Sequence, residues 1–214
     1  SDCIEWLTKK LEAAGRTAPR FHAHARPMLV EREATHRAIA LSELVDVPIL
    51  IVHVSGREAI EQIRWARAHG LKIFAETCPQ YLFLTAADLG IDDSYLGARC
   101  VCSPPPRDKA NQEVIWDGLN DGLFTVFSSD HAPFRYDAPE GKKPDGQEVA
   151  FRHIPNGIPG LDESPVVEPA QMRCDKRPCF GGGAEGPAVK VGGIAISHLS
   201  PDAGKWYERH QERE

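Results

Sequence analysis

The chain has 214 residues, of which 42% are hydrophobic and 26% are charged, and its formal net charge is −6. This balance is typical of a globular protein, and the negative charge excludes a basic surface for nucleic acid or anionic lipid. No stretch reaches the roughly 18 consecutive apolar residues of a membrane span, and the N-terminus lacks a signal-peptide pattern. Six cysteines at irregular spacings predict reduced thiols and a cytoplasmic location. Because the first residue is Ser1, we expect the numbering to begin inside a longer protein.

The first quarter of the chain is predicted to form two helices joined by a loop. Residues 1–14 have an amphipathic pattern that ends at Gly15. Residues 16–28 contain two prolines and are expected to form the loop. Residues 29–45 have apolar side chains at helical spacing, which predicts the second helix. The apolar positions of this helix are Leu29, Ala34, Ala38, Leu41 and Leu44.

Three short apolar runs then alternate with helical segments. The runs cover residues 49–54, 72–76 and 124–128, and the helical patterns cover 57–69 and 108–121. A continuous apolar run such as the first is typical of a strand covered on both faces, as in a parallel sheet. The alternation predicts an α/β fold with three adjacent parallel strands, as part of either a barrel or a doubly wound sheet.

Two residues with potential metal-binding side chains stand at the ends of predicted strands. His53 lies at the end of the first strand, and Asp130 follows the third. In parallel α/β folds, ligands and catalytic groups gather at the carboxyl ends of the strands. Imidazole nitrogen and carboxylate oxygen are natural zinc ligands. The pattern alone leaves two interpretations open, namely a pair of metal ligands, or a core histidine and a helix cap.

Five short motifs follow one another along the chain. They are His-Val-Ser (53–55), Glu-Thr-Cys-Pro-Gln-Tyr-Leu (76–82), Cys-Ser-Pro-Pro-x-Arg-Asp-Lys (102–109), Ser-Ser-Asp-His-Ala-Pro-Phe (128–134) and Ile-Pro-Asn-Gly-Ile-Pro-Gly (154–160). Their order and spacing resemble the dihydropyrimidinase/D-hydantoinase family of cyclic amidohydrolases, which are metal-bearing (β/α)8 TIM-type barrels. The resemblance implies that residues 1–161 are part of such a barrel, about strands six to eight with the surrounding helices. Residues 162–214 depart from it and are expected to form a divergent or disordered tail.

The resemblance also implies roles for four residues. His53 matches a metal-binding histidine, and Asp130 matches an aspartate that binds metal and moves a proton in catalysis. Ser103 and Asn156 match residues that bind the substrate ring. The implied cofactor is zinc, as two divalent metal ions in the intact family.

The implied reaction opens the amide bond of cyclic ureides, either dihydropyrimidines or hydantoins, and yields N-carbamoyl amino acids. The attacking hydroxide is shared by the two metal ions, and a carboxylate transfers its proton to the leaving nitrogen. The implied partner is a small cyclic amide, and the intact family is expected to be a homotetramer.

Several ligands of the family's metal pair have no counterpart in the matched region. His22 and His24 form the only His-x-His pair, but they follow a proline in a predicted loop, so we do not expect them to bind metal. We therefore expect the chain to be an incomplete fragment, inactive and poorly soluble by itself. Two alternatives stay open: an allantoinase-like or dihydroorotase-like enzyme, and a non-catalytic assembly relative or inactive fragment.

Overall fold

The computed structural model describes residues 2–132, 134–158, 190–191 and 194–195. Of the expected tail, only the antiparallel two-residue strands β4 (Lys190–Val191) and β5 (Ile194–Ala195) are described, and the rest lies outside the described residues. None of the helices in the described ranges is long and apolar enough to cross a membrane.

The N-terminal region forms three helices rather than two. Helix α1 covers Asp2–Ala13, and the chain turns after it at Gly15, whose φ is +70°. Helix α3 covers Met28–Val45. Both helices confirm the sequence prediction, but the loop between them contains a short helix, α2 (Phe21–His24). The loop prediction for this segment was therefore wrong in part, because the flanking prolines leave a single helical turn free to form.

Three parallel strands form the sheet, in the order β1-β2-β3. They are β1 (Ile49–Ile51), β2 (Ile73–Thr77) and β3 (Val126–Phe127). Helix α4 (Arg57–Ala68) connects the first two strands, and α6 (Lys109–Asn120) precedes the third. These elements confirm the predicted parallel α/β arrangement, although β1 and β3 are shorter than the predicted runs.

The long connection between β2 and α6, and the segment after β3, are built from short helices. The first contains α5 (Gln80–Phe83), η1 (Ala86–Leu89) and η2 (Tyr95–Cys100), and the second contains η3 (Pro144–Gly146) and η4 (Phe151–His153). Helices η1, η2 and η4 of these segments pack with α2 around a second, smaller core. The two segments contain four of the five sequence motifs, wholly or in part.

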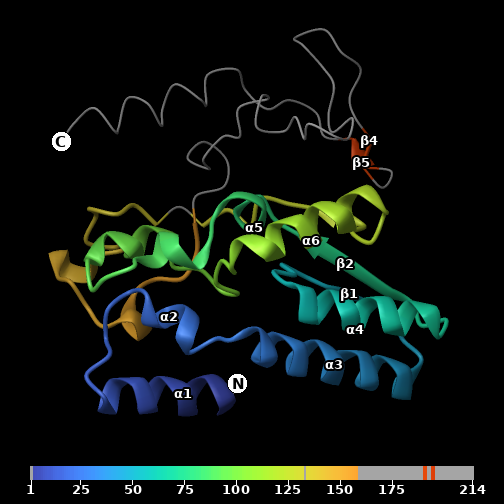
Figure 1. Cartoon of the computed structure of the whole chain (residues 1–214), viewed down its shortest axis with the longest axis horizontal. Helices are drawn as coiled ribbons and strands as arrows, with labels where there is room; N and C mark the ends of the chain where they lie inside the picture. Colours follow the sequence, from blue (N-terminus) through green and yellow to red (C-terminus); the bar gives the residue numbers. More distant parts are fainter. Residues whose placement is uncertain (1, 133, 159–189, 192–193, 196–214) are drawn as a thin grey trace, which may run out of the picture.

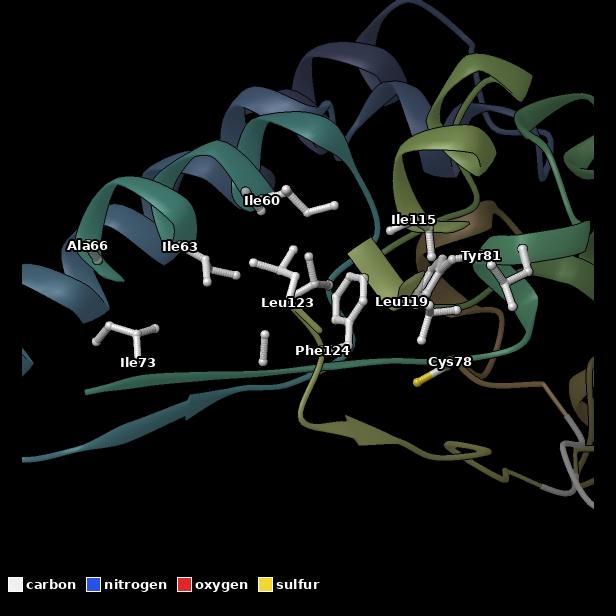
Figure 2. Close-up of a cluster of buried hydrophobic side chains, with 14 of the residues drawn as sticks. Ile60, Ile63, Ala66, Ile73, Cys78, Tyr81, Ile115, Leu119, Leu123 and Phe124 are labelled. Atoms are coloured by element: carbon white, nitrogen blue, oxygen red, sulfur yellow. The ribbon is translucent and has the colours of Figure 1, made fainter. Parts of the chain in front are cut away.

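The main hydrophobic core lies between the sheet and helices α4 and α6. Figure 2 shows Ile60 and Ile63 pointing from α4 toward the strands, with Phe124 packed beside them. Ile115 and Leu119 of α6 are also buried there. Burying side chains of this size is the dominant favourable term in folding, so this face fixes the helices on the sheet.

The opposite face of the sheet is not covered by the described residues. Leu50 and Phe74 are paired in register on β1 and β2, and each is 44% exposed. Val52, just after β1, is also exposed. In a closed barrel this face would be the interior.

Helix α3 buries a different face from the one its leucines mark. Figure 1 shows α3 beside α4, and the residues buried in α3 are Thr35, Ile39 and Ser42. By contrast, Leu41 and Leu44 are exposed to 58% and 80%. The apolar spacing thus predicted the helix correctly but did not show which side packs inward.

Candidate functional site at the carboxyl ends of the strands

His53 and Asp130 both lie just beyond the carboxyl ends of their strands in an unusual backbone conformation. The φ angles are +43° for His53 and +46° for Asp130, in the left-handed region. Non-glycine residues adopt this region infrequently, and such residues concentrate at functional sites. Because the strands are parallel, both residues stand at the same end of the sheet.

The backbone beyond the three strands is held together by hydrogen bonds. Val54 N donates to Glu76 O (2.9 Å), and Thr77 Oγ1 donates to Val54 O (2.9 Å). On the other side, Ser128 N donates to Thr77 O (3.2 Å). The carboxyl ends are therefore fixed relative to one another before any ligand binds.

The side chain of His53 has a free ligand atom. His53 is partly buried, and its Nδ1 is shielded from solvent without a hydrogen-bond partner among the described residues. Its backbone N–H donates to Glu76 Oε2 (3.1 Å), so a carboxylate lies at the same strand end. A buried, unpartnered imidazole nitrogen is costly unless it meets a donor or a metal ion.

Ser103 and Asn156 lie in direct contact. Ser103 Oγ donates to Asn156 Oδ1 at 2.7 Å, and both residues are exposed. The two belong to different sequence motifs that are 53 positions apart. Tyr81, from a third motif, donates from its hydroxyl to Pro104 O (3.0 Å), and this hydrogen bond helps to fix the loop that contains Ser103.

The segment of Asn156 runs beside the segment of Asp130. Ala132 N donates to Ile158 O (3.0 Å). A Cβ atom on Gly157 would lie 2.2 Å from Ala132 Cβ, so only glycine permits this approach. Asp130, Ser103 and Asn156 therefore lie on adjoining segments at the carboxyl edge of the sheet, and His53 lies at the same edge, just beyond the end of β1.

His22 has a structural role. It is fully buried, its Nε2 lies 2.8 Å from Cys102 O, and its Nδ1 lies 3.2 Å from Arg26 Nη1. Burial and the charge of Arg26 lower its pKa to about 3, so the ring is neutral and donates from Nε2. Nε2 also lies 3.4 Å from Ser103 Oγ, which places His22 under the Ser103 loop.

The neighbouring His24 does not join His22. Its Nδ1 lies 3.1 Å from Arg20 O, at the exposed side of α2. The His-x-His pair therefore sits on a helix and not at the end of a strand, and its two rings have separate partners.

A buried ion pair joins two more motifs. Arg107 Nη2 donates to Glu31 Oε2 (2.8 Å), and the side chains are only 7% and 11% exposed. Ser55 N donates to Glu31 Oε1 (2.8 Å), and Arg107 Nε donates to Ser55 Oγ (2.9 Å). The network attaches α3 to the strand end of His53. Glu31 was missed in the sequence because nothing in its helical pattern distinguishes it from a surface glutamate.

The thiols near this edge are not activated as nucleophiles or as metal ligands. Burial, together with the smaller effect of the charges of Glu76 and Asp130, raises the pKa of Cys78 to about 12, although a hydrogen bond with Ser128 lowers it. Burial also raises the pKa of Cys102. Neutral thiols are poor nucleophiles and poor metal ligands.

The donor set suits part of a metal site. An unpartnered imidazole nitrogen at His53 and an exposed carboxylate at Asp130 are ligand types that zinc takes. Within the ranges that the structure describes, however, no group of three or more His, Cys, Asp or Glu residues could hold a metal ion. The described residues therefore fit a share of a coordination sphere and not the whole of it.

The chain has parallel strands, helices packed on one face of the sheet, and polar residues beyond the carboxyl ends of the strands. Together these features define part of an α/β enzyme fold. No protein-family model matches the chain. The D-hydantoinase of Rhizobium radiobacter is 46% identical over 162 residues, which cover 76% of this chain and 34% of that protein. The D-hydantoinase of Ralstonia pickettii is 44% identical over the same shares.

A solved structure agrees with these relatives. The dihydropyrimidinase from Brevibacillus agri NCHU1002 superposes with a TM-score of 0.69 at 43% identity, covering 74% of this chain and 33% of that structure. The chain belongs to the D-hydantoinase/dihydropyrimidinase family, and it spans about a third of the length of these relatives.

Proposed function

We propose that the chain is the part of a cyclic amidohydrolase that contains barrel strands six to eight, and that the whole protein hydrolyses hydantoins or dihydropyrimidines. The observation that carries the proposal is the contact between Ser103 and Asn156 beside the segment of Asp130. The contact joins the two residues that we propose to bind the ring, and the segment of Asn156 pairs with the segment of Asp130 through Ala132 and Ile158. This supports a site at the carboxyl edge of the sheet, where parallel α/β enzymes have their catalytic groups.

The roles proposed for the chain's own residues follow from their chemistry. A ring imide presents one N–H donor between two carbonyl acceptors. The exposed hydroxyl of Ser103 and the Asn156 segment can meet both kinds of group. The carboxylate of Asp130 accepts a proton from the attacking water and returns it to the ring nitrogen as the C–N bond breaks. Water is thus added across the amide bond, and the product is an N-carbamoyl amino acid.

Zinc is the cofactor that we propose, with His53 and Asp130 as the ligands that this chain supplies. Two divalent ions would polarise the ring carbonyl and make water a stronger nucleophile. The remaining ligands would come from barrel strands other than β1, β2 and β3.

The uncovered sheet face supports a barrel that other strands complete. Leu50 and Phe74 form an apolar face, and no described strand pairs with the outer edge of β1.

Four unpaired cysteines within the described ranges agree with a cytoplasmic location. We also propose that the whole protein assembles as a homotetramer.

The share of the family that the chain covers supports a second proposal for the chain in isolation. Because it spans about a third of the length of its relatives, and His53 and Asp130 are the only ligands that we propose for it, we propose that residues 1–214 alone are an inactive fragment. The activity then belongs only to a longer chain.

A graft tests the proposed function. Residues 1–158 replace the matching segment of the Rhizobium radiobacter D-hydantoinase, and metal content and hydantoin hydrolysis are measured. We expect His53→Ala to remove bound metal and turnover, and Asp130→Asn to reduce turnover more than folding. The matched control His36→Ala, on the exposed side of α3, should leave both unchanged. A folded graft whose metal content is unaffected by His53→Ala contradicts the proposed ligand.

A further inference from the structure

Lys142 is a buried cation whose ammonium group donates hydrogen bonds to backbone carbonyls. It is 1% exposed. Its Nζ donates to Val101 O at 2.8 Å, Pro155 O at 2.6 Å and Gly157 O at 2.6 Å. An ammonium group has three N–H donors, so these three acceptors use its full capacity.

The three carbonyls belong to the two segments that contain Ser103 and Asn156. Val101 precedes Ser103 by two positions, and Pro155 and Gly157 flank Asn156 on either side. The segments touch directly at one further point, where Gly157 N donates to Val101 O (3.0 Å). The Nζ atom of Lys142 therefore forms hydrogen bonds with both segments and holds them together.

The position of Lys142 is itself fixed by its own loop. Its backbone N–H donates to Arg135 O (2.8 Å), and its carbonyl accepts from the hydroxyl of Tyr95 (2.7 Å). A Cβ atom on Gly141 would lie 1.8 Å from Arg135 O, so only glycine lets this loop close. The ammonium group is thus held on a rigid support.

The charge of Lys142 is balanced differently from that of its neighbour. Lys143 forms an ion pair with Glu148 (3.2 Å) near the surface. For Lys142, the described part of the chain offers no carboxylate at ion-pair distance. Burial lowers its pKa to about 8, while three carbonyl acceptors favour the protonated form. Burying a charged lysine costs free energy, and its hydrogen bonds must offset that cost.

We infer that Lys142 is a positioning residue, which fixes the Ser103 and Asn156 segments at the separation needed for their mutual hydrogen bond. Its relevance to substrate rests on the proposed function, because Ser103 and Asn156 are the residues assigned there to the ring. Lys142 itself reaches only backbone carbonyls and is not proposed to touch substrate.

The test is peptide-resolved hydrogen–deuterium exchange on residues 1–214 at low micromolar concentration. Lys142→Met removes the donors and keeps an unbranched side chain, and Lys143→Met is the matched control. We expect Lys142→Met to raise exchange about 10- to 100-fold in peptides covering 101–104 and 154–158. Exchange in the β2 peptide, 73–77, should stay within about threefold of the original chain, and Lys143→Met should leave all three peptides unchanged.

A second variant keeps the test decisive if Lys142→Met loosens the whole fold. In Lys142→Ala, n-propylammonium chloride can supply the missing ammonium group, and n-propanol is a neutral control of similar shape. Restoration of protection in both loops by the cation and not by the alcohol supports the inference. Equal exchange in all peptides, with no preference for the cation, overturns it.

Adding hydantoin separates the inference from the proposed function. We expect hydantoin to slow exchange in both loops of the original chain and of Lys143→Met, and not in Lys142→Met. If hydantoin protects neither loop of the original chain, ring binding by Ser103 and Asn156 is contradicted. The local effect of Lys142→Met would still stand in that case, because it does not depend on ligand.

Discussion

Ser103 Oγ donates a hydrogen bond of 2.7 Å to Asn156 Oδ1, across 53 positions of sequence. The contact joins the loop that follows η2 to the segment that follows η4, and that second segment pairs with the segment of Asp130 where Ala132 N donates to Ile158 O. Through this contact the motif at 102–109 meets the motif at 154–160. The predictions below start from this contact and from the groups that support it.

Removing the hydroxyl of Ser103 should weaken substrate binding. In the graft on the Rhizobium radiobacter D-hydantoinase, we expect Ser103→Ala to raise KM for hydantoin about 2- to 10-fold with kcat nearly unchanged, because a single hydrogen bond to bound substrate is lost. Steady-state kinetics measure the effect. Ser94→Ala, at the exposed start of η2, is the control. A large loss of kcat at unchanged KM contradicts a binding role.

Breaking the buried ion pair should destabilise the fold strongly. Arg107→Met leaves the carboxylate of Glu31 buried without its cation, and we expect a loss of about 3–5 kcal/mol in the free energy of unfolding. The control Arg64→Met removes an exposed ion pair with Asp121 and should cost under about 1 kcal/mol. Urea unfolding of each variant gives the comparison. Equal losses would show that burial of the pair is unimportant.

Stability should fall in mild acid because of His22. Its folded pKa of about 3 lies below the usual value of 6.5. The unfolded chain therefore takes up this proton first, and stability is lost as pH falls from about 6.5 toward 3. The loss is about 1.4 kcal/mol per pH unit within that window. Unfolding free energies between pH 6.5 and 5 should show a shallower slope in His22→Gln. An identical slope in both chains contradicts the assignment.

The uncovered strand face should limit solubility in the isolated chain. Leu50→Glu with Phe74→Lys places opposite charges at one register pair of β1 and β2. We expect severalfold more residues 1–214 in the supernatant after high-speed centrifugation. In the graft, the same pair would lie inside the barrel and should lower yield. Improved solubility of both proteins would show that this face is not a barrel interior.

The sequence predicted the strands and helices α4 and α6 well, because their apolar patterns are continuous and end at clear breaks. The motifs also indicated four candidate site residues, whose roles stay predictions, and the structure places Ser103 and Asn156 in contact. The inward face of α3 was not predictable from its leucines, because which side is buried depends on what packs against it. Glu31 and Lys142 were also missed, since their partners are remote in sequence and only the fold brings them together.

The rate of N-carbamoyl amino acid formation from hydantoin tests the central claim most directly. The measurement is made in one assay, with added zinc, on the isolated residues 1–214 and on the graft. We predict product from the graft, its loss in Asp130→Asn, and no product above background from the isolated chain. A catalytic metal normally needs three protein ligands, and the loss of a ligand is expected to lower the rate by far more than tenfold. Turnover by the isolated chain within about tenfold of a full-length D-hydantoinase would therefore contradict the claim that the chain supplies only part of the site.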